Sequence, residues 1–298
     1  MQAIFLMLVL FLIGGLCSVI SKKFQQCTSE TFLDFVWYNV VNAFIACIYF
    51  SVFSGFSLHL NITTFIFSLC YALCVCCSLV IGVCILSRVH ISTSVIISSS
   101  GNIIVSSVFG VLYFGEKLTF NLLLAMVMML IAAVLPLNFA LQSKRNSNKS
   151  IILTICVCII AFLNGGIINI ITKLYAVNPN VCDTTSFFFF TNAILLAGGI
   201  LILGFLMAKN KINIKQIVFT FTSKQLLFVA SNTALSNISS VLSVMVLAIL
   251  DVSLYTVIMS SLGIIRSAVL SLCFKEHLKT KDWISVALSV GAIIIVYI

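Results

Sequence analysis

The sequence predicts an all-α integral membrane protein with ten transmembrane helices arranged as two inverted five-helix repeats. The first reason is composition: 62% of the 298 residues are hydrophobic and 8% are charged, whereas a soluble domain carries about 25% charged residues. The second reason is a series of long apolar stretches, and the third is an internal repeat. No segment is long enough to form a separate soluble domain.

Each apolar stretch is close to the roughly twenty residues that a helix needs to cross the hydrocarbon core. Helices are expected because lipid offers no partner to backbone polar groups. The first stretch lacks a basic start and a clear cleavage site, so we interpret it as a helix and not as a signal peptide. The predicted spans are residues 3–21, 32–54, 63–86, 91–113, 119–140, 151–172, 184–207, 225–247, 252–273 and 281–298.

The repeat is visible in two matched segments, GGLCSVISKKF at residues 14–24 and GGIINIITKLY at residues 165–175. Each has paired glycines, then a lysine seven residues after the second glycine (Lys22, Lys173). GEKLT and KEHLK match later in the two halves, as do two Asn-Ala pairs within the second and seventh spans. With five spans in each half, the second half enters the membrane in the opposite sense, which gives an inverted repeat.

These matches predict the domain boundaries. Residues 1–141 form the first five-helix repeat and residues 151–298 form the second. The polar, basic segment 142–150 is expected to link them.

The net charge of +9 does not indicate a nucleic-acid partner, because the basic residues lie almost wholly at helix ends. All 16 Lys and Arg residues except Lys117, Lys173 and Arg266 lie in the loops after the odd-numbered spans. By the positive-inside rule these loops face the cytoplasm, and both termini face outward. We therefore expect a multi-pass protein, most simply in the cell membrane.

Residues 98–119, followed by an apolar helix, resemble the fourth-to-fifth-helix signature of the EamA branch of the drug/metabolite transporter superfamily. Residues 259–280 are similar to its second copy, and the Gly-Gly…Lys segments to its first-helix motif. The family often has proline where Ile103 and Gly263 stand here, and Lys275 replaces the glycine of the second Gly-Glu pair. Family members usually keep both termini in the cytoplasm, so the resemblance and the charge distribution predict opposite orientations.

The resemblance implies ten helices, a polar cavity near the bilayer midplane and alternating access. It implies a secondary transporter of a small polar metabolite, either amino acid-like or another anionic or zwitterionic solute. The alternative is a membrane-embedded enzyme or assembly factor without transport activity. Catalysis is not expected, because the 7 acidic residues and 3 histidines are scattered and no HExxH or Walker A motif occurs. Import or export, H⁺ or Na⁺ coupling and a homodimer all stay open.

No metal or other cofactor is predicted. Most of the 12 cysteines fall within apolar spans with no histidine beside them, so they are interpreted as filler in helix interfaces.

Arg266 is the most informative single residue. It lies ten residues before Glu276, or about 15 Å along a helix, near the bilayer centre. A charge at that depth costs about 2.5–3.5 kcal/mol on insertion scales, so it should face protein or a water-filled cavity. The guanidinium group suits a carboxylate or phosphate, so Arg266 is predicted to contact the substrate or the coupling ion. The alternative is an anchor to backbone carbonyls or to an acid such as Asp34 or Asp251.

The remaining candidate substrate contacts are polar or aromatic residues within spans. Asn42 and Asn192 are favoured over other asparagines such as Asn232, because the repeat places them equivalently. All of these amides could instead bond across helices. The aromatic candidates, which line a cavity or belong to the interfacial belt, are Trp37, Tyr38, Tyr71 and Tyr255.

Five charged residues are candidates for coupling or for structural roles. Glu116 and Glu276 lie at short turns, where a carboxylate is expected to cap the start of a following helix. Lys22 and Lys173 end their predicted spans and are expected to extend toward the interface, or to act in gating or on an anion. Asp34, early in the second span, is a comparable candidate.

Overall fold

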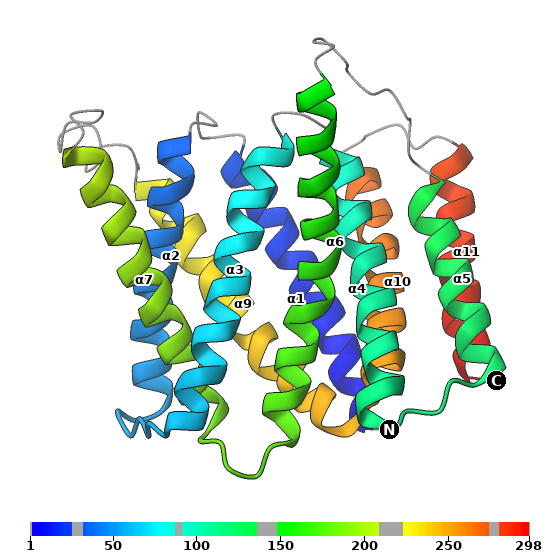
Figure 1. Cartoon of the computed structure of the whole chain (residues 1–298), viewed down its shortest axis with the longest axis horizontal. Helices are drawn as coiled ribbons and strands as arrows, with labels where there is room; N and C mark the ends of the chain where they lie inside the picture. Colours follow the sequence, from blue (N-terminus) through cyan, green and yellow to red (C-terminus); the bar gives the residue numbers. More distant parts are fainter. Residues whose placement is uncertain are drawn as a thin grey trace. The chain divides into compact units, whose positions relative to one another are not determined.

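The computed structural model describes residues 2–25, 32–86, 91–135, 148–208, 223–273 and 280–297, and these fold into ten helices without a strand (Figure 1). The all-α prediction is therefore confirmed for this part of the chain. Nearly every predicted span coincides with a helix to within a few residues at each end. The helices are α1 (Gln2–Gln25), α2 (Phe32–Phe53), α3 (Ile62–Leu86), α4 (Ile91–Phe114), α5 (Phe120–Val134), α6 (Asn148–Val177), α7 (Thr184–Ala208), α9 (Ser223–Ile249), α10 (Val252–Cys273) and α11 (Thr280–Tyr297).

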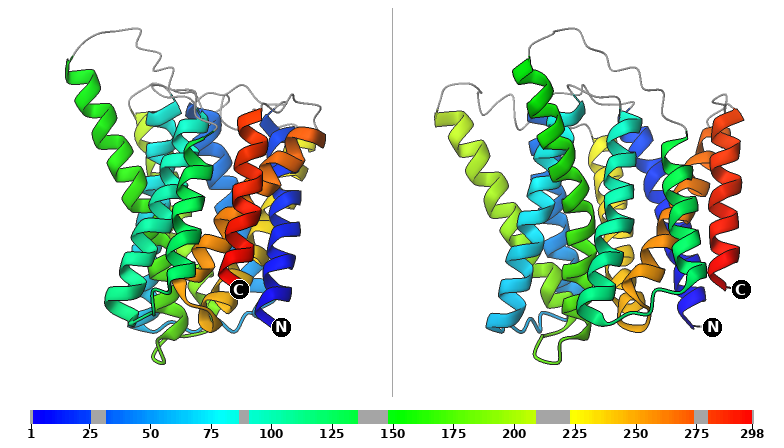
Figure 2. Two further views of the ribbon diagram at one scale, coloured as in Figure 1. Left: turned by 90° about the vertical axis from the view of Figure 1, so that its right-hand side faces the viewer. Right: turned by 45° about the vertical axis from the view of Figure 1, so that its right-hand side comes forward.

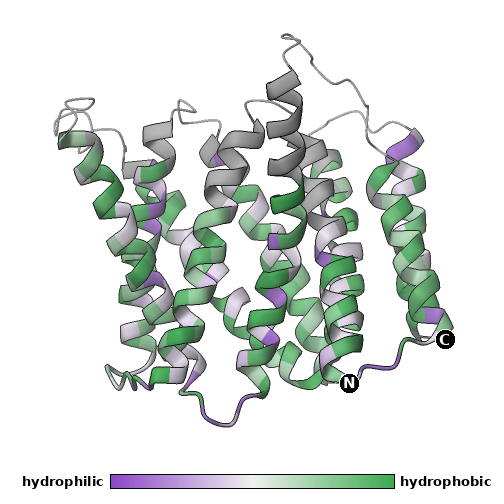
Figure 3. Ribbon diagram, viewed as in Figure 1, coloured by the Kyte–Doolittle hydropathy of each residue, from purple (hydrophilic) through white to green (hydrophobic). Residues whose placement is uncertain are grey.

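Within the described ranges, six helices are long and apolar enough to cross a membrane, namely α1, α2, α6, α7, α9 and α10. Figure 3 shows that most of each helical ribbon is apolar, with hydrophilic residues in the connections from α4 to α5 and from α6 to α7 and at scattered positions along the helices. A membrane protein is thereby supported. Ten crossings and the two repeats stay predictions, and residues 142–147 of the expected linker lie outside the described ranges.

The chain forms two compact units that do not follow the order of the sequence. The first unit comprises Met1–Met7, Cys74–Ala176 and Val246–Ile298, and the second comprises Leu8–Leu73 and Val177–Met245. Each unit therefore takes segments from both halves of the chain.

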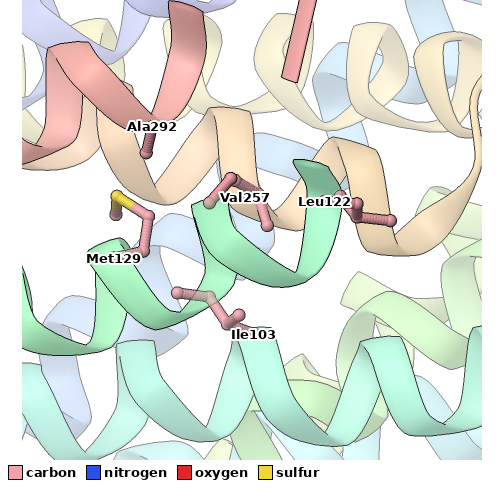
Figure 4. Close-up of a cluster of buried hydrophobic side chains, with 6 residues drawn as sticks. Ile103, Leu122, Met129, Val257 and Ala292 are labelled. Carbon is pink, nitrogen blue, oxygen red and sulfur yellow. The ribbon is translucent and has the colours of Figure 1, made fainter. Parts of the chain in front are cut away.

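In the first unit, α10 packs against α4, α5 and α11, and α5 lies beside α11 (Figures 1 and 2). Its core gathers side chains from all four of these helices (Figure 4). In lipid such packing is stabilised by dispersion and not by the exclusion of water. The buried core residues are Ile103, Leu122, Ala125, Met129, Val257 and Ala292.

Glycine brings α4 and α6 close together in the first unit. A Cβ at Gly101 would overlap the backbone of Phe162, and one at Gly166 would overlap the side chain of Val105. Helix backbones that approach this closely need small residues at the crossing. Gly166 belongs to the repeated glycine pair, whereas its counterpart Gly15 would have no atom within 4 Å of an added Cβ.

In the second unit, α2 packs along α7. Val36 and Val40 of α2 bury their side chains against Leu203 of α7, with Trp37 packed on this cluster. Further along the pair, the ring of Phe50 stacks on that of Phe188 with centroids 5.6 Å apart.

Candidate functional site

Helix α9 carries many polar residues for a candidate membrane span. The apolar segment Gln225–Ile249 is long enough to cross a bilayer, yet polar residues recur along it at spacings of three and four. That spacing places them on one side of the helix. They are Asn232, Thr233, Ser236, Asn237, Ser239, Ser240 and Ser243.

The first polar residues of this face bond to α2 and α1. The amide Nδ2 of Asn232 donates to the hydroxyl of Tyr38 at 3.0 Å, and the Asn232 Oδ1 accepts from Ser21 at 3.4 Å. The Thr233 hydroxyl lies 2.5 Å from Oδ1 of Asn42. These bonds join segments about two hundred residues apart, all within the second unit. We call Ser21, Tyr38, Asn42, Asn232 and Thr233 the α2–α9 polar cluster.

One turn further along α9, the side-chain amide of Asn237 is a hydrogen-bond donor without an acceptor. Asn237 is 7% exposed, and its amide Nδ2 has no hydrogen-bond partner. The serines beside it bond to their own helix: Ser236 donates to the carbonyl of Thr233 at 3.0 Å, and Ser240 to that of Ser236 at 2.9 Å. An unsatisfied buried amide costs about 1–3 kcal/mol.

Three predicted contacts in the second unit have other neighbours. Trp37 packs on the apolar α2–α7 cluster, and the Tyr71 ring lies edge-on to Phe187 with centroids 5.4 Å apart. Asn192 is buried and donates to the carbonyl of Phe188 in its own helix at 2.7 Å. The structure therefore places Tyr38 and Asn42 in one cluster. The contacts of Trp37, Tyr71 and Asn192 given above are with other residues.

The first unit contains a second polar arrangement, at the turn between α9 and α10. Glu116 is 8% exposed and accepts three hydrogen bonds from the start of α10. Its Oε1 accepts from the backbone N–H of Val252 at 2.6 Å. Its Oε2 accepts from the N–H of Ser253 at 3.1 Å and from the Ser253 hydroxyl at 2.5 Å. The carboxylate thus satisfies N–H groups that a helix leaves unpaired at its N-terminus.

The predicted cap is therefore on a different helix. The sequence suggested that Glu116 would serve the helix that follows it, but α5 is capped by Thr119, whose Oγ1 accepts from the N–H of Leu122 at 3.3 Å. Two glycines make the placement of Glu116 feasible. Gly115 has a φ of +65°, and a Cβ at Gly110 would occupy the space of the Glu116 carboxylate.

Lys173 bonds to the end of α9, on the other side of the same turn. It is 7% exposed, and its Nζ donates to the carbonyl oxygens of Leu247 and Leu250, both at 2.7 Å. Phe114 lies beneath the ammonium group, with its ring centroid 5.9 Å away. A cation at a helix C-terminus satisfies carbonyls that lack partners within the helix. We call Glu116 and Lys173 the α9–α10 clamp.

The expectation that Lys173 extends toward the membrane interface is wrong. We predicted that its ammonium group would extend to the interface, because the predicted span ended at residue 172. Helix α6 continues to Val177, so Lys173 lies more than a turn inside it and is buried.

Arg266 and Tyr255 both lie on α10 in the first unit, with Arg266 half-buried and Tyr255 5% exposed. Asp251 directly precedes α10, so about 22 Å of helix separates it from Arg266. An ion pair needs atoms within about 4 Å, and the suggested anchoring of Arg266 to Asp251 is therefore wrong.

Three other predicted residues cannot be placed in a site. Lys22 lies on α1 and Asp34 on α2, but their side chains are outside the description, and Glu276 lies outside the described ranges. Within those ranges, no three His, Cys, Asp or Glu side chains are grouped so as to hold a metal ion.

Asn237 and Thr233 were missed by the sequence analysis, and Asn232 was given no priority. The signal was present: residues 231–243 read SNTALSNISSVLS, a polar run inside an apolar segment.

Comparison with known proteins identifies the fold and no family. No protein-family model matches the chain, and no curated protein sequence matches it. Chains of solved structures do match. One of them, described only as the crystal structure of a protein, is 13% identical with a TM-score of 0.71, and the match covers 99% of this chain and 96% of that one. At that identity the likeness shows that nearly the whole chain has the fold of a solved structure.

Proposed function

We propose that the chain is a secondary transporter that moves a small polar metabolite across a membrane by alternating access. The observation that carries the proposal is the α2–α9 polar cluster. Its residues lie on helices with the length and hydropathy of membrane spans. Polar side chains on such helices face protein or a water-filled cavity, because lipid cannot hydrogen-bond them.

The proposal includes the finer architecture. Ten transmembrane helices in two inverted five-helix repeats, of the EamA-like type in the drug/metabolite transporter superfamily, account for the matched sequence segments. Such halves supply the rocking motion that alternating access needs. The cell membrane is the expected location, and H⁺ or Na⁺ coupling and a homodimer are compatible with this architecture.

Arg266 is the proposed contact for a carboxylate or phosphate of the solute. The support is its half-buried position on α10, a helix long and apolar enough to cross a membrane. A charge there needs a polar environment, and a guanidinium group binds planar anions in a bidentate manner.

The test is uptake by proteoliposomes containing the purified chain, with radiolabelled amino acids, sugar phosphates, nucleosides and amines supplied in turn. Uptake that saturates and is accelerated by unlabelled solute on the other side supports the transporter. Repeating uptake under imposed H⁺ and Na⁺ gradients identifies the coupling ion. Absence of uptake for every solute by folded protein would favour a membrane-embedded enzyme or assembly factor.

Arg266→Gln tests the anion contact within the same assay. We expect loss of uptake for an anionic or zwitterionic solute, while the variant inserts and unfolds like the wild type. Unchanged uptake kinetics would exclude Arg266 as the recognition residue.

A further inference from the structure

We propose that Asn237 and the α2–α9 polar cluster bind an uncharged part of the solute, and that the Asn237 amide donates a hydrogen bond to a carbonyl or hydroxyl oxygen there. This inference rests on the proposed transport function and adds the chemistry of one binding site to it. It concerns the second unit alone.

The placement of Asn237 is set by the helix. It lies four residues after Thr233, so both side chains project from nearly the same side of α9, about 6 Å apart along the axis. Thr233 is bonded to Asn42 on α2, and Asn232 to Tyr38. Asn237 therefore continues a face whose preceding positions already recognise polar groups.

The unpaired amide is what distinguishes Asn237 from the other buried asparagines that have been described. Asn164 donates to the carbonyl of Cys74 at 2.9 Å and to the Ser78 hydroxyl at 2.6 Å, and Asn192 donates within α7. Native proteins satisfy most buried hydrogen-bond donors, so a buried donor without an acceptor needs an explanation. A ligand oxygen at Asn237 Nδ2 would supply the missing acceptor.

The chemistry of the site selects an uncharged group. Tyr, Asn, Thr and Ser side chains offer amide and hydroxyl groups, and none of the six residues carries a formal charge. Among these six side chains a carboxylate, phosphate or ammonium would find no opposite charge, and burying an unpaired charge is far costlier than burying a hydrogen-bonded neutral group. Carbonyl, amide and hydroxyl groups match both the donors and the acceptors of the cluster.

The experiment measures binding to the full chain in lipid nanodiscs by isothermal titration, independently of transport. The neutral probes are uridine, glucose and nicotinamide; the charged probes are glutamate, glucose 6-phosphate and choline. Asn237→Leu removes the amide at similar volume. Asn237→Asp keeps the shape and replaces the donor with an acceptor. Ser240→Ala is the control, since that hydroxyl is bonded to its own helix.

We expect at least one probe to bind, either a neutral one or an anionic one whose charge lies outside the cluster. Asn237→Leu should weaken binding by about threefold to tenfold, the equivalent of one neutral hydrogen bond. Asn237→Asp should weaken it further, because a carboxylate repels an acceptor oxygen, and Ser240→Ala should stay within about twofold of the wild type. In the absence of solute, Asn237→Leu should raise the unfolding temperature, because it removes an unsatisfied buried donor.

Several results would overturn the inference. They are binding of none of the probes, binding that both Asn237 variants leave unchanged for every probe that binds, or a lower unfolding temperature for solute-free Asn237→Leu. The last would mean that the amide already has a partner. Failure of the transport proposal is a separate result: neutral binding that depends on Asn237, with no uptake by proteoliposomes, would keep the site and reject transport.

Discussion

Replacing Glu116 removes the cap of α10, and the loss in free energy of unfolding can be estimated from the contacts of its carboxylate. The carboxylate accepts two backbone N–H groups and one hydroxyl, and it is 8% exposed. A hydrogen bond to a charged group contributes about 1.5–3 kcal/mol, and each buried donor left unpaired costs about 1–3 kcal/mol. Because contacts to one group are not additive, we expect Glu116→Ala to lower the free energy of unfolding by about 3–5 kcal/mol.

Glu116→Gln should have a smaller effect. Its side-chain oxygen still accepts from one N–H group, but its NH₂ group meets a donor at the second position. We expect a loss of about 1.5–3 kcal/mol, because the charge assistance disappears and one pairing becomes repulsive.

The measurement is reversible unfolding of the purified chain in mixed micelles, titrated with a denaturing detergent. Asp282→Asn is the matched control, because Asp282 is an acid in the first turn of α11 that is only half-buried. A first-turn carboxylate at the surface contributes about 0.3–1 kcal/mol through the helix dipole. If Glu116→Ala costs no more than Asp282→Asn, the carboxylate does not cap α10 as the structure indicates, and the reasoning is refuted.

Three further predictions concern packing, the second clamp residue and orientation. Lys173→Met should cost about 2–4 kcal/mol in the same titration, because two carbonyl oxygens lose a charged donor; a change below about 1 kcal/mol would contradict the bonding described. Gly101→Ala should destabilise by about 2–4 kcal/mol, because the backbone of Phe162 cannot move aside, whereas Gly15→Ala should change stability by less than about 1 kcal/mol. Equal effects at the two glycines would contradict the close approach of α4 to α6. Ser147→Cys, probed in intact cells with a membrane-impermeant maleimide, should be labelled no more than the wild type with its 12 native cysteines if the charge distribution sets the topology; additional labelling would support the orientation of the resembling family.

The positions of the helices could be predicted because they depend on local composition. A backbone in lipid must satisfy its polar groups within the segment, so an apolar stretch of sufficient length becomes a helix whatever surrounds it. The start of α10 at Val252 and the end of α2 near Phe53 follow from the sequence in this way.

The partners of the charged residues could not be predicted, because they depend on contacts between distant segments. That Glu116 would cap a helix follows from a carboxylate at a turn, but the helix it caps begins 136 residues later. Similarly, the role of Lys173 depends on how far α6 continues and on the position of the end of α9. Hydropathy defines the apolar part of a span and not the last turn of its helix.

The structure also explains why the glycines and the charged residues of these motifs occur together. Gly166 and Gly101 let α6 and α4 approach closely, and α4 carries Phe114 at its end, beneath the Lys173 ammonium group. Beyond Phe114, Gly115 turns the chain with a positive φ, so that Glu116 folds back over Gly110 and reaches α10. The Gly-Gly…Lys segment and the Gly-Glu segment, which look independent in the sequence, therefore meet at one turn. A side chain at Gly166 would move α6 away from α4, and Lys173 could not then keep both Phe114 and the carbonyls of α9 in contact.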